Sequence, residues 1–434
     1  MDKVVISDKI YISNPTKEEL DSIISTLTYK IPKPFNPNAS LYRYVPYDII
    51  KNYKVVSNNI IAIPQTRIDL ITENTEIIDK RVSIPIEFPI PVHPLYDNQK
   101  EVYDKVEGNV IINAAPGWGK TFTALYLAYK LKQKTLVIVH TLFLRDQWIE
   151  SIKSLFKQDC GIISSGTVNH DSFITIGNIQ TLKKHAVRLN KSFGLVIVDE
   201  CHHCPSTTFT ETLVNFHSKY KIGLSGTLQR KDGKQVLLRD AFGDHVIKTH
   251  GNVMIPSVKL LKTNFQTEGS SGWADRLTNL LQNKDYMQFI ADLAKAHMQM
   301  GYCVLILADR TEFVEGMQPL IGDKCISVTG KTKDRESIVK RTLSGDFDCI
   351  SASTRIFSEG ISINRLSAVI LANPINNDSL LEQIIARIQR FHDKDKLDPI
   401  IIDIQLAGYA DAKQNNSRRG FYMRKGWHIE EIKI

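Results

Sequence analysis

Short apolar runs and longer amphipathic segments alternate along most of the chain. From about residue 93 onward, runs of a few apolar residues recur, and each is followed by a longer segment that mixes apolar and charged positions. The short runs predict buried strands, and the longer segments predict helices. Such alternation is typical of a parallel sheet with helices on both faces, where ligands bind beyond the carboxyl ends of the strands.

The alternation occurs twice, which predicts two similar α/β units in tandem. One series lies between His93 and about His250, and a second begins at about Asn252. The predicted strands of the first series are Val110–Asn113, Thr135–His140, Phe173–Ile176, Leu195–Val198 and Lys221–Leu224. The predicted strands of the second series are Val304–Ala308, Cys325–Val328, Cys349–Ala352, Ala368–Ala372 and Ile400–Ile404.

The N-terminal region has a different pattern. It predicts one strand over Val4–Ile12, a helix that Asn14-Pro15 opens, and further short strands around turns rich in proline and asparagine. This region carries 11 cationic and 11 acidic side chains and is therefore neutral overall. We expect a small α+β accessory domain here and place the domain boundaries at residues 1–92, 93–250 and 251–434.

Length and composition restrict the class of protein. At 434 residues the chain is too long for a single core, and 42% hydrophobic with 24% charged residues is ordinary for a soluble globular protein. Apolar runs long enough to cross a bilayer are absent, and the N-terminus lacks the order of a signal peptide. Six irregularly spaced cysteines do not resemble a disulfide framework, so we expect a cytoplasmic location.

One short segment is densely basic. Lys413–Lys425 contains five cations and no acid, with Phe421 and Tyr422 between them, within a chain whose net charge is +8. Cations among aromatic rings suit a polyanion whose bases can stack, so Arg418 and Arg419 are candidate nucleic-acid contacts. A solvated helix end is the alternative, and both interpretations remain open.

A glycine-rich turn follows the predicted strand Val110–Asn113. Gly117 and Gly119 allow successive backbone N–H groups to point inward, and the next helix adds the positive end of its dipole. Lys120 can then reach the β- and γ-phosphates of ATP, and the Thr121 hydroxyl can bind Mg²⁺. An ordinary strand–turn–helix junction is the alternative. The candidate ATP-binding residues of this turn are Ala115, Pro116, Gly117, Trp118, Gly119, Lys120 and Thr121.

Two adjacent acids follow another predicted strand, Leu195–Val198. A nucleotide hydrolase needs such acids at a strand end: Asp199 can hold the Mg²⁺ that bridges the phosphates, and Glu200 can orient and deprotonate the attacking water. Both the acids and the glycine-rich turn follow strands of the same predicted sheet, so each supports the other.

Two features near these motifs have structural interpretations. Packing of Trp118 against the neighbouring helix is favoured over stacking on a base or nucleotide. Cys201–Cys204 spells Cys-His-His-Cys, but four consecutive residues cannot all turn toward one tetrahedral zinc ion, and no second cluster completes a site. The histidines, His202 in particular, are better suited to couple the ATP site to neighbouring elements.

Taken together, these motifs resemble those of superfamily 2 helicases. Asp199-Glu-Cys-His202 after a phosphate-binding loop is typical of that family, and Val139–Trp148, Thr175–Leu182 and Leu224–Thr227 resemble its next motifs in order. The resemblance implies an adenine contact for Gln99 and coupling of hydrolysis to movement by Ser225 and Thr227. The nucleic-acid backbone contacts that it implies in this unit are Thr141, Arg145, Gln180 and Thr181.

The second unit resembles the same family. Ile306–Arg310, Thr354–Ile363 and Gln383–Arg390 are similar to its fourth, fifth and sixth motifs. The resemblance implies that Arg387 and Arg390 act on the γ-phosphate as arginine fingers. It also implies nucleic-acid contacts for Arg310 and Thr354 and a nucleotide contact for Gly360. Four positions depart from the family pattern without removing a charged group: Ala114, Gly226, Ser362 and Ala386.

Within the superfamily, the chain is similar to phage branch-migration helicases of the UvsW kind, with XPB-type and RecG-type relatives. The similarity rests on Asp199–His202, Phe357–Ile363 and a small domain that contains Phe35-Asn-Pro and Tyr42-Arg-Tyr. It implies two tandem RecA-like domains that use ATP and Mg²⁺ to remodel branched DNA in replication, recombination or repair. It also implies a monomer or weak oligomer without a membrane partner, in the host cytoplasm if the chain is phage-encoded. An RNA helicase and a double-strand DNA translocase motor are the alternatives.

Overall fold

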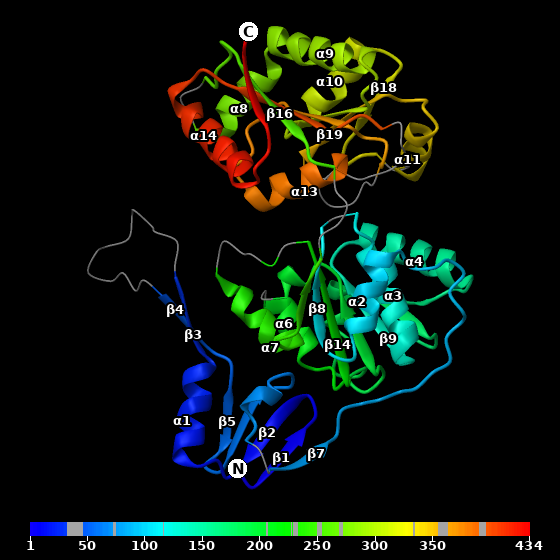
Figure 1. Ribbon diagram of the computed structural model, residues 1–434, viewed down its shortest axis with the longest axis vertical. Helices are drawn as coiled ribbons and strands as arrows, with labels where there is room; N and C mark the ends of the chain where they lie inside the picture. Colours follow the sequence, from blue (N-terminus) through cyan, green and yellow to red (C-terminus); the bar gives the residue numbers. More distant parts are fainter. Residues whose placement is uncertain are drawn as a thin grey trace. The chain divides into compact units, whose positions relative to one another are not determined.

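The computed structural model describes most of the chain, and its contacts divide it into two compact units, Met1–Gly251 and Asn252–Ile434 (Figure 1). Each unit is described by itself. The described residues are 1–32, 47–72, 75–115, 117–204, 207–226, 228, 233–249, 254–268, 272–332, 335–354, 363–389 and 396–434.

The first unit begins with a small five-stranded sheet in the order β5-β6-β2-β1-β7. Its elements are β1 (Lys3–Ile6), β2 (Lys9–Ser13), α1 (Lys17–Thr26), β5 (Lys54–Ser57), β6 (Ile60–Pro64) and β7 (Glu76–Asp79). A separate two-stranded ribbon consists of β3 (Thr28–Pro32) and β4 (Tyr47–Lys51). The helix is where the sequence predicts it, because Thr16 and Glu19 form a reciprocal capping box at its start.

The prediction of a single strand over Val4–Ile12 is wrong. β1 and β2 are antiparallel partners, with Ile6 opposite Ile10, and the chain reverses at Ser7 and Asp8. Polar residues that form local hydrogen bonds favour a turn, and Asp8 accepts one from the Ser7 hydroxyl at 2.8 Å. Both strands bury alternate residues, so their pattern cannot be distinguished from that of one longer strand.

The rest of the first unit is an eight-stranded sheet in the order β11-β10-β12-β9-β13-β14-β8-β15, parallel except for the β10–β11 pair. Its strands are β8 (Val110–Asn113), β9 (Thr135–Val139), β10 (Gly161–Ser164), β11 (Thr167–Asn169), β12 (Ile174–Asn178), β13 (Leu195–Val198), β14 (Tyr220–Ser225) and β15 (Val246–Lys248). Its α-helices are α2 (Asp97–Lys105), α3 (Lys120–Leu131), α4 (Leu142–Phe156), α5 (Ile179–Leu182), α6 (Thr207–Leu213) and α7 (Leu237–Phe242).

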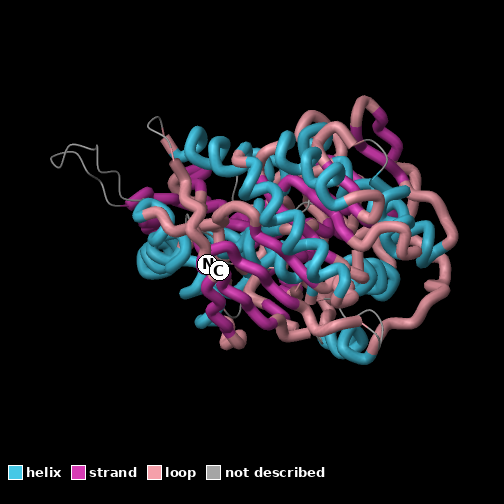
Figure 2. Tube along the Cα trace, turned by 90° about the horizontal axis from the view of Figure 1, so that it is seen from above, coloured by secondary structure: helices cyan, strands magenta, loops and turns pink. Residues whose placement is uncertain are grey.

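Helices cover both faces of this sheet, as the sequence predicts. One apolar cluster joins α2, α3 and α4 to alternate residues of the strands, such as Ile222 and Leu224, and a second joins α5 and α7 to the opposite face. Figure 2 shows the strands in magenta with the helices in cyan beside them. The strands are therefore buried on both sides, which accounts for their nearly continuous apolar sequences.

The second unit repeats this architecture with a seven-stranded parallel sheet in the order β18-β19-β17-β20-β21-β16-β22. Its strands are β16 (Ser257–Lys262), β17 (Val304–Ala308), β18 (Cys325–Val328), β19 (Cys349–Ser353), β20 (Ala368–Leu371), β21 (Ile400–Gln405) and β22 (Ile429–Lys433). Its helices are α8 (Trp273–Gln282), α9 (Lys284–Gln299), α10 (Thr311–Ile321), α11 (Arg335–Leu343), α13 (Asp378–Ile388) and α14 (Tyr409–Arg424).

A buried ion pair joins the N-terminal sheet to the larger sheet of the same unit. Arg67 donates to Asp240 of α7 at 2.8 Å, and the two side chains are 1% and 2% exposed. Tyr29 and Asn52 also donate to the Asp240 carboxylate, and the Thr66 hydroxyl donates to its backbone carbonyl. Because every partner of this carboxylate comes from the first 67 residues, the N-terminal sheet and α7 form a continuous packed structure.

None of the helices in the described part of the chain combines the length and apolar character that crossing a bilayer requires.

Candidate nucleotide and nucleic-acid site

The candidate residues of the first unit collect at one edge of the eight-stranded sheet. The glycine-rich turn follows β8, Asp199 and Glu200 follow β13, and Ser225 ends β14. These three strands are neighbours in the order β13-β14-β8, so their carboxyl ends lie together. We call this part of the edge the phosphate half. We call the adjoining ends of β9 and β12 the strand-contact half, after the nucleic-acid strand that their residues are expected to contact.

The glycine-rich turn has the backbone conformation that its sequence predicts. Gly117 and Gly119 have φ angles of 86° and 98°, a region that favours glycine, and α3 begins at Lys120. The ammonium of Lys120 donates to the carbonyl oxygens of Ala114 and Ala115 at 2.7 and 3.4 Å. The lysine therefore lies folded over its own loop, where a nucleotide phosphate can compete for it.

Gln99 holds this loop against α2. Its amide nitrogen donates to the carbonyl of Trp118 at 3.0 Å, and its amide oxygen accepts from the backbone N–H of Tyr96 at 3.1 Å. A Cβ on Gly119 would lie 2.1 Å from the same amide nitrogen, so a side chain here would displace the Gln99 amide, and the φ angle of 98° itself favours glycine. Both ends of Gln99 are engaged here, and its adenine contact stays a prediction.

Trp118 packs into the apolar cluster under α2, α3 and α4 and is only 7% exposed. This confirms the packing interpretation over stacking on a base.

Asp199 and Glu200 occupy a buried turn after β13. The indole N–H of Trp148 donates to Asp199 Oδ2 at 2.8 Å, and the backbone N–H of Glu200 donates to Oδ1 at 3.0 Å. Glu200 has a φ angle of 48°, a left-handed conformation that turns the chain sharply at this point. The two carboxylates are thereby held in separate surroundings although they are adjacent in sequence.

These surroundings shift the pKa values of the two carboxyl groups in opposite directions. Burial, reinforced by the charge of Glu200, raises the pKa of Asp199 to about 6. Burial also acts to raise the pKa of Glu200, but contact with His202 and the charge of Lys120 outweigh it and lower the pKa to about 2. Glu200 is therefore ionised at neutral pH and able to accept a proton or hydrogen bond from water.

His202 connects the acids to the end of β14. Its Nδ1 lies 2.9 Å from the hydroxyl of Ser225 and 3.3 Å from Glu200 Oε2. The rings of His203 and His202 are 4.2 Å apart, and those of His203 and His140 are 4.6 Å apart. A row of three imidazoles, tilted relative to one another, thus links the ends of β9, β13 and β14. The sequence predicted a coupling role for the histidines at 202 and 203 and for Ser225, but it indicated none for His140 and Trp148, which only spatial contact identifies.

The oxygen donors of the phosphate half suit a hard divalent cation. Asp199 offers a buried carboxylate and Thr121 a hydroxyl, the donor types that Mg²⁺ prefers when phosphates and water complete its shell. Groups of three or more histidine, cysteine, aspartate or glutamate side chains able to hold a metal are absent from the described residues. The carboxylate of Asp199 and the hydroxyl of Thr121 are donors that fit a cation bound together with a nucleotide.

In the strand-contact half, the candidate residues are partly exposed and attached to helix starts. Thr141 caps α4 by accepting from the backbone N–H of Leu144 at 3.2 Å. Arg145, one turn later, donates to Ser164 at 3.1 Å. Gln180 is exposed and Thr181 half-buried at the start of α5. Since β9 and β12 are adjacent, these side chains form one row beside the phosphate half.

In the second unit, the candidate residues have internal contacts of their own. Arg310 donates to Thr278 and to the carbonyl of Ala274, both at 2.9 Å. Thr354 follows β19 and is 3% exposed, and Arg387 lies in the last turn of α13. The roles of these residues stay predictions. Four further candidates lie outside the described residues: Pro116, Thr227, Gly360 and Arg390.

The interpretation of Lys413–Lys425 as a nucleic-acid patch requires correction. This segment lies in α14 and the residue after it, where the Arg418 guanidinium makes a fully buried pair with Asp403 at 2.7 Å. Tyr422 is 0% exposed and donates to the same carboxylate, and Phe421 is 3% exposed. Arg418 and the two rings therefore hold α14 on the sheet and are not accessible to bases.

The other cations of this segment are mostly paired as well. Arg419, Arg424 and Lys425 form ion pairs with Glu431, Asp378 and Glu382, respectively. A density of positive charge in the sequence thus becomes a nearly neutral surface in the fold. Arg419 is half exposed and remains a candidate contact.

Two segments of the chain match known protein families. Residues 91–230 match the family described as "Type III restriction enzyme, res subunit", and residues 285–392 match the helicase conserved C-terminal domain. The chain is 38% identical to "Probable helicase D10" of Escherichia phage T5, over 98% of this chain and 95% of that protein.

Two more distant relatives differ in the nucleic acid that their names give. The chain is 27% identical to "DNA 3'-5' translocase XPB2" of Sulfurisphaera tokodaii, over 71% of this chain and 80% of that protein. It is also 27% identical to L396 of Acanthamoeba polyphaga mimivirus, named as an ATP-dependent RNA helicase, over 99% of this chain and 86% of that protein.

Solved structures show the same fold. S. cerevisiae Dbp5 bound to RNA and ADP BeF3 matches 78% of this chain and 89% of that chain, with a TM-score of 0.57 and 11% identity. The crystal structure of T4 UvsW matches 100% of this chain and 99% of that chain at 18% identity, but its TM-score of 0.42 supports no conclusion. The two parallel-sheet domains are thus RecA-like, as the sequence predicts.

Proposed function

Since the chain belongs to the superfamily 2 helicases, which hydrolyse ATP, we propose that it is a DNA helicase or translocase that acts on forked and four-way DNA junctions. The observation that supports the motor assignment most directly is the convergence of Lys120, Asp199 and Glu200 at one sheet edge, beside the strand-contact half. ATP chemistry and nucleic-acid contact would then share a rigid scaffold.

The residues of the phosphate half have separate roles in ATP hydrolysis. The N–H groups of the glycine-rich turn cradle the phosphates, and Lys120 exchanges its carbonyl partners for phosphate oxygens. Glu200, ionised and held beside His202, orients the attacking water and accepts its proton. When bound, Mg²⁺ neutralises phosphate charge, and Asp199 and Thr121 are the residues that would hold it.

His202 is the proposed connection between hydrolysis and movement. Its Nδ1 contacts both Glu200 and Ser225, so a change at the γ-phosphate reaches the segment that follows β14 through one imidazole. Ser225 is the last residue of β14 and Thr227 belongs to the segment after it, and we propose that this segment passes the change to the nucleic acid.

Arg387 and Arg390 are the proposed arginine fingers. An arginine that acts only as charge develops on the transferring phosphoryl group affects turnover and not ATP affinity. We therefore expect Arg390→Ala to lower kcat by about 10³-fold while ATP binding stays near normal. Single-turnover hydrolysis and nucleotide titration measure the two separately. A variant with normal kcat would transfer this role to Arg387.

The strand-contact half and its counterparts in the second unit are the proposed nucleic-acid contacts. DNA is favoured as the partner because the relative XPB2 is named a DNA translocase. The match with this chain covers four-fifths of the length of XPB2. An RNA helicase is the second candidate, because the name of the mimivirus relative gives RNA and that match spans 99% of this chain.

The decisive experiment is steady-state ATPase activity with single-stranded DNA, blunt duplex, fork, four-way junction and RNA at equal nucleotide concentration. The proposal expects strong stimulation by DNA, greatest for the fork and the four-way junction. Greater stimulation by RNA would make the chain an RNA helicase. Equal stimulation by blunt duplex and junction, without strand separation, would make it a double-strand translocase.

We propose that residues 1–92 provide the preference for branches. Tyr42, Arg43 and Tyr44 offer two rings and a cation but lie outside the described residues. Deleting the whole region would leave the buried carboxylate of Asp240 without Arg67, which is strongly destabilising. A triple alanine variant of the three residues keeps this ion pair and is the cleaner test. Loss of junction preference with unchanged stimulation by single-stranded DNA is expected, and an unchanged preference would assign it to the core.

The setting proposed for this activity is the cytoplasm, that of the host if the chain is phage-encoded, with the enzyme acting as a monomer or weak oligomer. Sedimentation with and without a four-way junction tests the oligomeric state.

A further inference from the structure

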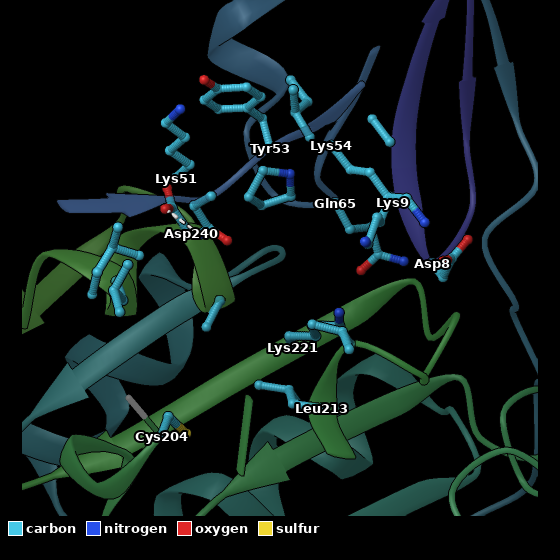
Figure 3. A pocket seen from close by; sticks show the side chains of 18 residues that line it. Asp8, Lys9, Lys51, Tyr53, Lys54, Gln65, Cys204, Leu213, Lys221 and Asp240 are labelled. Atoms are coloured by element: carbon cyan, nitrogen blue, oxygen red, sulfur yellow. Dashed lines mark hydrogen bonds between the residues drawn. The ribbon is translucent and has the colours of Figure 1, made fainter. Parts of the chain in front are cut away.

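A cavity of about 330 Å³ lies between the N-terminal sheet and the larger sheet of the first unit (Figure 3). It is separate from the phosphate half, because it reaches β14 at Lys221, near the start of the strand, whereas Ser225 lies at its end. Its walls are largely aliphatic. Contributions come from the N-terminal sheet through Ile63 and Pro64, from β4 of the two-stranded ribbon through Ile50, and from the larger fold through Leu213, Leu237 and Ala241.

Lys221 supplies a buried cation to this cavity. The residue is 4% exposed, and Figure 3 shows its side chain rising from the strand into the space between the two sheets. Among the described residues, its ammonium makes neither a hydrogen bond nor an ion pair within 4.0 Å. Burial lowers the pKa of Lys221 to about 8, and the charge of Asp8 opposes this only in part. A buried charge without a partner is costly, so an anion in the cavity would stabilise it.

Neighbouring groups increase the positive character of this end of the cavity. Lys9 lines it near Lys221, together with Gln65 and Asp8 (Figure 3). The Asp8 carboxylate is already engaged, because it accepts from the hydroxyls of Ser7 and Tyr11 at 2.8 and 3.2 Å. Asp240, the other acid in the wall, is paired with Arg67. The charge of Asp8 offsets part of the cost of burying Lys221, but among the described residues the two groups do not approach within 4.0 Å, and Asp240 is held by Arg67.

We propose that this cavity binds a small amphipathic organic anion, with its carboxylate or phosphate group beside Lys221 and its apolar body against the aliphatic walls. The volume is at the lower end of the range for small-molecule sites, and an apolar lining with few convergent polar groups is typical of them. The occupant contacts both sheets of the unit. It also contacts Cys204, the residue directly after His203. It therefore stabilises the junction between the N-terminal sheet and the ATPase fold.

Fluorescence titration with 8-anilinonaphthalene-1-sulfonate, an aromatic anion, tests the site in the full-length protein at pH 7. We expect saturable binding whose affinity Lys221→Met lowers by about tenfold. This change in affinity corresponds to the loss of one hydrogen bond to a charged group. Lys219→Met removes the same charge two residues earlier, outside the cavity lining, and is expected to bind as the wild type does. Equal affinity in the wild type and Lys221→Met would overturn the proposal.

Competition identifies the chemistry of the occupant. Benzoate and phenyl phosphate are expected to displace the probe, and the more effective of the two shows whether a carboxylate or a phosphate is preferred. Uncharged benzyl alcohol is the matched control and is expected not to displace it. Displacement by benzyl alcohol at the same concentrations would show a purely apolar cavity and reject the role of Lys221.

A measurement on the wild-type protein covers the case in which Lys221→Met does not fold. Acetic anhydride acetylates accessible amines, and peptide mapping reports the rate at each lysine. A saturating concentration of the probe is expected to slow acetylation of Lys221 several-fold and to leave Lys219 unaffected. An unchanged rate at Lys221 would place the probe elsewhere and refute the site.

Discussion

The two halves of the sheet edge in the first unit are built differently. In the phosphate half the functional side chains are buried or half-buried and contact one another: Trp148 holds Asp199, and His202 lies between Glu200 and Ser225. In the strand-contact half, Thr141 caps a helix and Gln180 is exposed. Hydrolysis requires charges held in place before the reaction, whereas nucleic-acid contact requires accessible groups. The difference predicts that variants of the phosphate half change turnover and variants of the strand-contact half change affinity.

The largest effects are expected in the phosphate half. Lys120→Ala and Glu200→Gln are both expected to lower multiple-turnover hydrolysis by at least about 10³-fold, because one loses a phosphate contact and the other the water-activating carboxylate. They differ in ATP affinity. Lys120→Ala weakens ATP binding, whereas Glu200→Gln retains ATP, as equilibrium nucleotide titration would show. Equal loss of ATP affinity in both variants would contradict the division of roles.

A smaller effect is expected from the hydrogen bond that orients Asp199. Trp148→Phe keeps most of the buried ring and removes the indole N–H that donates to Oδ2 at 2.8 Å. Loss of such an orienting partner typically costs about tenfold in metal affinity or activity. We therefore expect kcat to fall about tenfold and the Mg²⁺ concentration for half-maximal activity to rise. If kcat falls equally at all Mg²⁺ concentrations and excess Mg²⁺ does not restore it, the indole only fills space.

In the strand-contact half, Arg145→Ala is expected to spare ATP hydrolysis measured without nucleic acid. It is expected to raise the DNA concentration for half-maximal stimulation a few-fold and to reduce the salt dependence of binding by about one counterion. Lys153→Ala is the matched control, since Lys153 lies on the same helix, is 71% exposed and pairs only with Asp159. Identical salt dependence in both variants would exclude a phosphate contact by Arg145.

The smallest effect is expected from Arg419→Ala. This side chain already pairs with Glu431 and is half exposed, so its removal is expected to weaken DNA binding about twofold at most. Filter binding at low salt measures this. A loss approaching that of Arg145→Ala would place α14 in the nucleic-acid site and extend the contact surface beyond the two motifs after β9 and β12.

The amino-acid sequence determined the local structure and the chemistry. All strands predicted from the alternation are present, because residues buried on both faces of a parallel sheet leave continuous apolar runs. The strands that the sequence did not predict, such as Thr167–Asn169, Ser257–Lys262 and Ile429–Lys433, carry polar residues, so neighbouring strands decide whether they form. Lys120, Asp199 and Glu200 were identifiable because each follows a predicted strand.

Only the tertiary structure decided which charged side chains are accessible to a ligand or to nucleic acid. Arg418 belongs to the most basic segment of the chain, yet Asp403 of β21, the strand that precedes α14, binds it in the core. Trp148 reaches Asp199 across 51 residues, and the cavity at Lys221 exists because Arg67 holds a second sheet against α7. In each case the partner belongs to a different element of the fold. A local pattern specifies the side chain, but whether it meets water, a ligand or an opposite charge depends on which elements pack against it.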